Sequence, residues 1–221
     1  AGQTCIAPDH ILVERHLKEN LLDNLRTSVK NLYGENAIDS PDLASIVNES
    51  QYQRLKNLLK DAFSKKQVFY GGETDDKQLR ITPTIIEIND LNDPLMKEEI
   101  FGPLMPVISI KNLEEALDQI RKKPKPLAIY LFGGSELDQK NLIKKSSSGG
   151  ICFNDVVLQA GIPNMPFGGV GSSGIGRYHG LAGFEAFSHQ KAVFKRSFWL
   201  DIKLRYPPYK LNIKILKNLL R

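Results

Sequence analysis

The sequence of 221 residues contains few cysteines, histidines, methionines and tryptophans: two, four, three and one, respectively. Two cysteines far apart in the sequence provide no disulfide framework, which favours a reducing compartment and therefore a cytoplasmic protein. No apolar run is long enough to span a bilayer, and the first residues have no signal-peptide pattern. The sequence begins without methionine, so we interpret Ala1 as a cut end rather than a natural start. No group of residues has metal-ligand spacing, and we predict no metal site.

Positive charge is concentrated at one end of the chain. Residues 191–221 contain nine basic residues and one acid, a net charge of +8, whereas the whole chain carries +5. The rest is therefore mildly acidic, so we do not expect nucleic acid as a partner. Hydrophobic residues make up 41% and charged residues 25% of the sequence, as in an ordinary globular protein.

Apolar periodicity alternates between the period of a strand and that of a helix. Short apolar runs predict strands, and apolar residues at helical spacing predict helices between them. This alternation predicts an α/β fold with a mainly parallel sheet flanked by helices. The expected strands are 11–13, 68–70, 81–88, 104–110, 127–132 and 150–153, and the expected helices are 17–32, 40–59, 113–120 and 137–145.

Cys5 lies in a short segment between Gly2 and the first predicted strand. A thiol on a loop before a strand can face a cleft, where a nucleophile needs access to its substrate. The alternative is a small buried hydrophobic residue, which is the commonest role of a single cysteine. The spacing alone leaves both interpretations open.

Two further loops are unusual. Residues 97–103 place Glu98 and Glu99 before Phe101 and a Gly-Pro turn. Residues 164–176 are rich in glycine, which indicates positive φ angles or a very close approach by another group. The loop 164–176 lacks the Gly-Lys-Ser/Thr ending of a phosphate-binding loop, so packing is favoured over ligand binding.

In this order, the three loops resemble the aldehyde dehydrogenase superfamily. The segments that carry the resemblance are Gly-Gln-Thr-Cys (2–5), Glu-Glu-Ile-Phe-Gly-Pro (98–103) and Pro-Phe-Gly-Gly-Val-Gly-Ser-Ser-Gly (166–174). The extended form Gly-Gln-Thr-Cys-Ile-Ala-Pro-Asp (2–9) is most similar to class 3, the fatty aldehyde dehydrogenase branch. The resemblance covers residues 1 to about 208.

The resemblance implies a reaction and a cofactor. Cys5 matches the nucleophile that forms a thiohemiacetal and then a thioester, with NAD or NADP as hydride acceptor. Glu99 matches the carboxylate that holds the nicotinamide ribose, and Phe101 matches the ring beside the nicotinamide. The implied substrate is a medium- or long-chain aliphatic aldehyde.

Other residues of these loops are expected to support the site. Phe167 either lines the aldehyde entrance or belongs to the core. We interpret the remaining candidates as structural: Gly168 and Gly169 let their loop pass close to the site, Asn154 orients backbone near the thiol, Glu98 is a solvated or ion-paired acid, and His179 and His189 are not bases.

The resemblance also implies what this chain does not contain. The family's general base, the side-chain amide of its oxyanion hole and its Rossmann-like coenzyme domain would all precede residue 1. We therefore expect a catalytic half that does not oxidise aldehydes alone, because losing even one oxyanion donor costs a factor of about 10²–10³. The alternative is a truncated or non-catalytic homologue that acts as a structural or dimerisation protein.

The expected organisation has three parts. Residues 1–190 form the catalytic domain, 191–208 an oligomerisation strand with a C-terminal extension, and 209–221 a basic amphipathic tail. The resemblance implies a homodimer that shares the strand 191–196 between subunits. The tail suits either a reversible contact with an intracellular membrane surface or a helix docked on protein.

Overall fold

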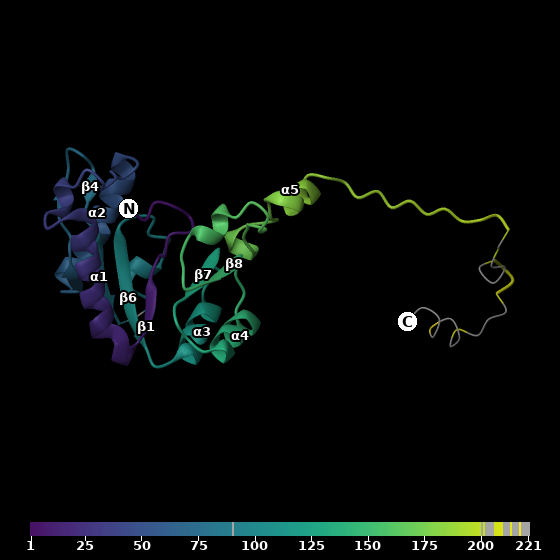
Figure 1. The fold of residues 1–221 in the computed structure, drawn as a ribbon, viewed down its shortest axis with the longest axis horizontal. Coiled ribbons are helices and arrows are strands. Elements are labelled where there is room, and N and C mark those ends of the chain that lie inside the picture. Colours follow the sequence, from purple (N-terminus) through teal and green to yellow (C-terminus); the bar gives the residue numbers. More distant parts are fainter. Residues whose placement is uncertain (90, 200, 202–205, 210–212, 214–216, 218–221) are drawn as a thin grey trace. The chain divides into compact units, whose positions relative to one another are not determined.

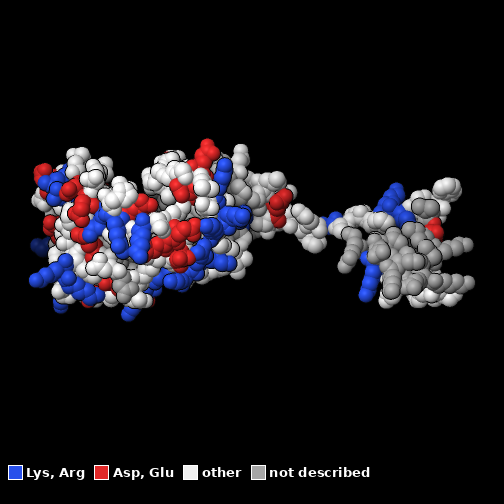
Figure 2. Space-filling model, turned by 90° about the horizontal axis from the view of Figure 1, so that it is seen from below, with Lys and Arg blue, Asp and Glu red and all other residues white. Residues whose placement is uncertain are grey.

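A computed structural model describes residues 1–89, 91–199, 201, 206–209, 213 and 217. The chain divides into two units, Ala1–Phe187 and Ser188–Arg221. The first unit contains every named helix and strand of the described residues (Figure 1). On the face shown in Figure 2, basic and acidic side chains of this unit are interspersed.

The main sheet of the first unit has four strands in the order β1-β6-β5-β2. β6 (Leu104–Ile110) lies at its centre and pairs in parallel with both β1 (Ile11–Glu14) and β5 (Thr84–Ile88). β2 (Val68–Tyr70) pairs antiparallel with β5 and ends the sheet on that side. The central strands are buried on both faces, which explains their nearly continuous apolar sequence.

Two long helices accompany this sheet (Figure 1). α1 (Lys18–Tyr33) ends where predicted, because Gly34 takes a φ of 84° that stops the helix. α2 (Glu49–Ser64) starts later than predicted, since the side chain of Asn48 caps it by accepting a hydrogen bond from the Gln51 amide at 2.9 Å. Ser40 instead accepts a backbone hydrogen bond from Leu43 in a separate turn.

The predicted strand over residues 81–88 is divided into two. β4 (Arg80–Ile81) pairs with β3 (Thr74–Asp75) in a hairpin, whereas β5 joins the main sheet. Thr82 and Pro83 lie between them, and Pro83 has no backbone donor with which to continue a ladder. The core over this region includes Tyr52 of α2, which is fully buried.

A separate two-stranded sheet is the parallel pair of β7 (Ala128–Leu131) and β8 (Gly150–Phe153). α3 (Leu113–Lys122) precedes β7, and α4 (Glu136–Lys145) connects the two strands. α4 begins with a capping box between Ser135 and Asp138. The unit ends with α5 (Gly180–Ala186), and short 3₁₀ turns occupy Arg15–Leu17, Ala37–Asp39, Pro94–Met96, Leu158–Gly161 and Gly171–Ser173.

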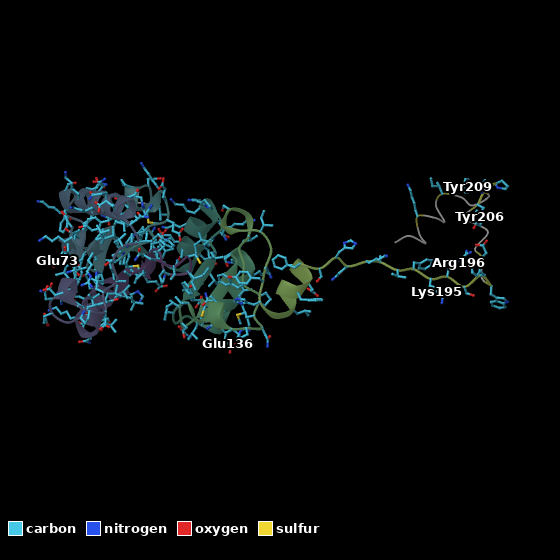
Figure 3. All side chains as sticks on the ribbon, turned by 90° about the horizontal axis from the view of Figure 1, so that it is seen from above. Glu73, Glu136, Lys195, Arg196, Tyr206 and Tyr209 are labelled. Atoms are coloured by element: carbon cyan, nitrogen blue, oxygen red, sulfur yellow. The ribbon has the colours of Figure 1, made fainter. Side chains whose placement is uncertain are left out.

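The second unit exposes aromatic and apolar side chains. Phe194, Phe198 and Trp199 are 88%, 99% and 93% exposed. Figure 3 labels Lys195, Arg196, Tyr206 and Tyr209 in this unit. The predicted amphipathic tail falls mostly on residues outside the described ones, namely 210–212, 214–216 and 218–221. Among the helices that the structure describes, none has the length and apolar character needed to cross a bilayer.

Candidate active site

Cys5 stands at the tip of a tight turn. The Ala7 amide donates to the Thr4 carbonyl at 3.0 Å, which makes Cys5 and Ile6 the two central residues. Ile6 is buried, with 8% of its surface exposed, whereas Cys5 is exposed. The turn therefore buries one neighbour and presents the thiol outward, so the interpretation of Cys5 as a small buried core residue is wrong.

The residues before Cys5 attach this turn to the region before α2. The side-chain amide of Gln3 donates to the Ser45 carbonyl at 3.0 Å and accepts from the Val47 amide at 2.9 Å. Gly2 has a φ of 69°, and a Cβ added to it would lie 2.2 Å from the carbonyl oxygen of Gly102. Only glycine permits this approach. The segment that leads into the cysteine turn is therefore in contact with the Glu98–Pro103 loop.

A second contact joins the same two loops. The Asp9 carboxylate accepts a hydrogen bond from the Ile100 amide at 2.8 Å. The Arg54 guanidinium, from α2, donates to the carbonyl of Ile100 and, at 3.4 Å, to the carbonyl of Glu99. The backbone around Glu99 is thus held from two directions. Asp9 ends the segment 2–9 that carries the class 3 resemblance, but the sequence assigned it no role, because its contact spans 91 positions. Arg54 was not singled out, because its contacts span 45 and 46 positions.

Glu99 has a perturbed carboxyl group. Glu99 is exposed, but partial desolvation of its carboxyl group raises its pKa above the ordinary value, and the negative charge of Asp9 acts in the same direction. The positive charge of Arg54 opposes both effects. Within the described part of the chain, no donor forms a hydrogen bond with the Glu99 carboxylate. Its oxygens are therefore available to hydroxyl groups of a ligand.

Phe101 follows in a strained conformation. Its φ of 49° is unusual for a large residue and places it at a reversal of the chain before Gly102. Such strain persists only where the surroundings hold it, and it is concentrated at functional sites. Phe101 is half-buried, whereas Glu98 is exposed.

The third predicted loop lies against β7 and β8. Phe167 forms paired backbone hydrogen bonds with Tyr178 at 2.9 and 2.8 Å, and the two rings pack edge to face with centroids 5.5 Å apart. The His179 ring stacks on the Phe167 ring, with the two centroids 6.0 Å apart. A cavity of about 150 Å³ opens here, lined by Leu127, Ala128, Gly149, Gly150, Ile151, Gln159, Met165, Pro166 and Phe167.

The glycines of this loop permit backbone-to-backbone packing. A Cβ on Gly168 would lie 2.2 Å from the Gly176 carbonyl oxygen, and one on Gly169 would lie 2.1 Å from that of Ser173. Asn154 directly follows β8 with a φ of 58°, and its side chain accepts from the Gly133 amide at 2.8 Å. It therefore orders the turn after β7.

The first loop is joined to this region by Tyr130 of β7. Its hydroxyl donates to the Ile6 carbonyl at 2.6 Å, directly after Cys5. The structure thus connects the cysteine turn with the Glu99 loop on one side and with β7 on the other. The sequence places Tyr130 in the expected strand 127–132 but assigns it no function, because its contact with Ile6 spans 124 positions.

The sequence that forms these loops matches a known protein family. The aldehyde dehydrogenase family model matches residues 1–193. The chain belongs to the aldehyde dehydrogenase family. Its relatives include aldehyde dehydrogenase family 3 member H1 of Arabidopsis thaliana, 43% identical over 219 residues, and family 3 member A2 of Rattus norvegicus, 43% identical over 209 residues. The predicted resemblance to class 3 is confirmed.

These alignments cover 99% and 94% of this chain but only 45% and 42% of the two relatives. The chain therefore spans less than half of their length.

Solved structures confirm the predicted fold. The substrate-bound state of Staphylococcus aureus AldH superposes with a TM-score of 0.87 at 39% identity, over 100% of this chain and 48% of that one. Betaine aldehyde dehydrogenase from Staphylococcus aureus, in complex with NAD⁺, superposes with a TM-score of 0.74 at 25% identity, over 85% of this chain and 38% of that one.

Proposed function

We propose that this chain is the catalytic portion of an NAD(P)-dependent aldehyde dehydrogenase that oxidises medium- or long-chain aliphatic aldehydes to carboxylic acids. The observation that carries the proposal is the position of Cys5. Its thiol is exposed three residues after Gly2, whose backbone packs against Gly102 in the loop of Glu99 and Phe101. A nucleophile next to a candidate coenzyme loop is the arrangement that hydride transfer from a covalent adduct requires.

In the proposed reaction, the Cys5 thiolate adds to the aldehyde carbon and forms a C–S bond, which leaves an oxyanion on the former carbonyl oxygen. The Cys5 backbone N–H is the donor from this chain that stabilises that oxyanion. Loss of hydride from the same carbon converts the adduct to a thioester. Water then cleaves the C–S bond, which releases the carboxylic acid and restores the thiol.

The residues of the Glu99 loop suit a nicotinamide dinucleotide. This cofactor supplies the acceptor for the hydride. The Glu99 carboxylate, which is exposed and accepts no hydrogen bond from the described residues, would accept hydrogen bonds from the ribose hydroxyls. The half-buried ring of Phe101 would lie beside the nicotinamide. Two relatives support both cofactor forms by name, the NAD⁺-bound betaine enzyme and the dimeric NADP-preferring enzyme of Rattus norvegicus.

We place the aldehyde chain near Phe167. The cavity beside this ring is lined mainly by apolar groups, as an aliphatic chain requires. Phe167 is half-buried, so both of its sequence interpretations, entrance and core, stay predictions.

The proposal concerns the whole protein, because relatives are more than twice as long as the part matched here. We predict that the 221-residue chain alone does not turn over hexanal with NAD, since the resemblance assigns the base and the coenzyme phosphate site to preceding residues. Measuring NADH formation by absorbance checks this. Turnover that disappears in a Cys5→Ala variant would contradict the prediction.

Alkylation of the chain separates the enzyme from a non-catalytic homologue. Iodoacetamide labelling is followed at Cys5 and Cys152 by peptide mass spectrometry, in the folded chain and in urea. If Cys5 is activated, it reacts faster when folded than when unfolded, and faster than Cys152. If it is only exposed, its folded rate does not exceed its unfolded rate. That result would favour the structural or dimerisation protein and overturn the proposed function.

We further propose a homodimer that pairs residues 191–196 of two subunits. Val193 and Phe194 in this segment are 82% and 88% exposed, which is unusual for apolar residues without a partner surface. Sedimentation equilibrium tests this, and a Phe194→Glu variant should shift the chain to monomer. A monomeric unmodified chain at micromolar concentration would refute it.

A further inference from the structure

Tyr130 lies where the carboxyl ends of β7 and β8 meet. It is in register with Cys152 on the neighbouring strand and precedes the last residue of β7. The carboxyl edge of a parallel sheet is where functional side chains collect. The ring is half-buried, and its hydroxyl reaches beyond the sheet to two other segments.

The Tyr130 hydroxyl uses its whole hydrogen-bonding capacity. It accepts from the Gln159 side-chain amide at 3.0 Å and from the Val157 backbone amide at 3.4 Å. A phenol has one proton and two acceptor positions. Because two donors occupy the acceptor positions, the proton is directed to the Ile6 carbonyl, 2.6 Å away. The bond to the residue after Cys5 is therefore fixed in direction as well as in distance.

The segment that supplies one of these donors is strained. Val157 has φ and ψ angles of 68° and −40°, and the Leu158 amide donates to the Val156 carbonyl at 2.7 Å. This is a γ-turn with positive φ, a rare and unfavourable form, and here its centre is a β-branched residue. Such a conformation persists only when neighbouring contacts impose it. The Val157 amide aimed at Tyr130 is one of those contacts.

The other end of the connection sets the cysteine turn. Ile6 is held by its buried side chain and, through its carbonyl, by Tyr130. Cys5 is the preceding residue of the same four-residue turn, so its backbone direction depends on how Ile6 is held. We propose that Tyr130 is a positioning residue that holds the Cys5 turn in its reactive orientation by a hydrogen bond to Ile6. This inference rests on the proposed function of Cys5.

The test substitutes Tyr130→Phe in the 221-residue chain, which removes the hydroxyl and keeps the ring. Amide hydrogen exchange is measured residue by residue by NMR, with the Ala7 amide as the reporter because it closes the cysteine turn. We expect exchange of the Ala7 amide to accelerate by about fivefold, the factor that corresponds to one net hydrogen bond.

A Tyr52→Phe variant is the matched control. It also removes one tyrosine hydroxyl that donates to an acceptor, the Asp76 carboxylate, at 2.5 Å. The Tyr52 side chain, on α2, belongs to a core cluster that does not include Ile6. This control should leave the Ala7 exchange rate relative to other amides unchanged, and thermal denaturation of both variants shows whether each is folded.

Alkylation of Cys5 provides the functional readout. In the folded Tyr130→Phe chain, we expect the Cys5 rate to move toward its rate in urea, with no such change in Tyr52→Phe. If the Ala7 amide is unaffected by Tyr130→Phe, the positioning role is refuted. If Ala7 exchange accelerates but the Cys5 rate is unchanged, Tyr130 is only structural, which also refutes it. If unmodified Cys5 is not activated at all, the proposed function fails instead, whereas Ala7 exchange still tests the hydrogen bond.

Discussion

Gly149 marks the place where the glycine-rich loop packs against the start of β8. A Cβ added to Gly149 would lie 2.2 Å from the Gly168 carbonyl oxygen and 2.6 Å from that of Leu127. Gly150 is the next residue, and a Cβ there would meet nothing within 4 Å. Neither glycine has a positive φ, so alanine fits the backbone conformation of both. The two positions therefore differ in available space and in little else.

Gly149→Ala is expected to destabilise the chain. To restore an ordinary contact, the backbone of the glycine-rich loop must move by roughly 0.8 Å, from 2.2 Å to at least 3.0 Å. Overpacking of this kind costs about 1–3 kcal/mol. Gly150→Ala should instead stabilise by about 0.4–1 kcal/mol, because alanine restricts the unfolded chain. For a domain of this size the first change lowers Tm by about 2–12 °C.

Urea denaturation followed by circular dichroism measures both variants against the unmodified chain. The free energies of unfolding should differ between Gly149→Ala and Gly150→Ala by at least about 1.5 kcal/mol. A difference below about 0.5 kcal/mol would refute the reasoning, because it would mean that the Gly168 carbonyl does not lie against Gly149. The comparison also tests the wall of the cavity beside Phe167, which both glycines line.

Two further predictions concern titrating groups. Burial, and then the hydrogen bond to Asp76, raises the pKa of Tyr52 to about 12. The unfolded chain loses this proton near pH 10, so the stabilisation from the protonated form is complete below pH 10 and is lost as pH rises from 10 to 12. Urea unfolding between pH 9 and 11 should show this loss in the unmodified chain and less of it in Tyr52→Phe; equal slopes would contradict it. Asp9→Asn keeps an acceptor for the Ile100 amide but removes a negative charge, so the pKa of Glu99 should fall. Titration of the Glu99 carboxyl carbon by NMR measures this, and an unchanged or higher pKa would be evidence against the contact.

Apolar periodicity predicted the helices and strands whose type and ends are determined by residues within or next to them. The strands at the centre of the sheet are apolar on both faces, and Gly34 stops α1 by its backbone conformation alone. The start of α2 was misplaced because Ser40 and Asn48 are both good caps, and only the position of the helix in the fold decides between them. Thr82 and Pro83 likewise divide one apolar run between two sheets.

The candidate site could be predicted only where its residues form a continuous motif. Cys5, Glu99 and Phe101 belong to such motifs, and the family that they indicated is confirmed. The contacts that join the loops could not be predicted, because Tyr130 meets Ile6 over 124 positions and Asp9 meets Ile100 over 91. Long-range contacts of single polar atoms leave no periodic pattern in a sequence.

The turn around Cys5 is restrained on both sides of the thiol. On the N-terminal side of Cys5, the Gln3 side chain is hydrogen-bonded to the backbone of Ser45 and Val47. On the C-terminal side, Ile6 is held by its buried side chain and by the hydrogen bond of its carbonyl. With the backbone fixed at both ends, the main torsional freedom left to the sulfur is rotation about the Cα–Cβ bond. That rotation has three staggered minima. Reorienting the Cys5 sulfur is then a rotamer change of one side chain, which requires no movement of the loop.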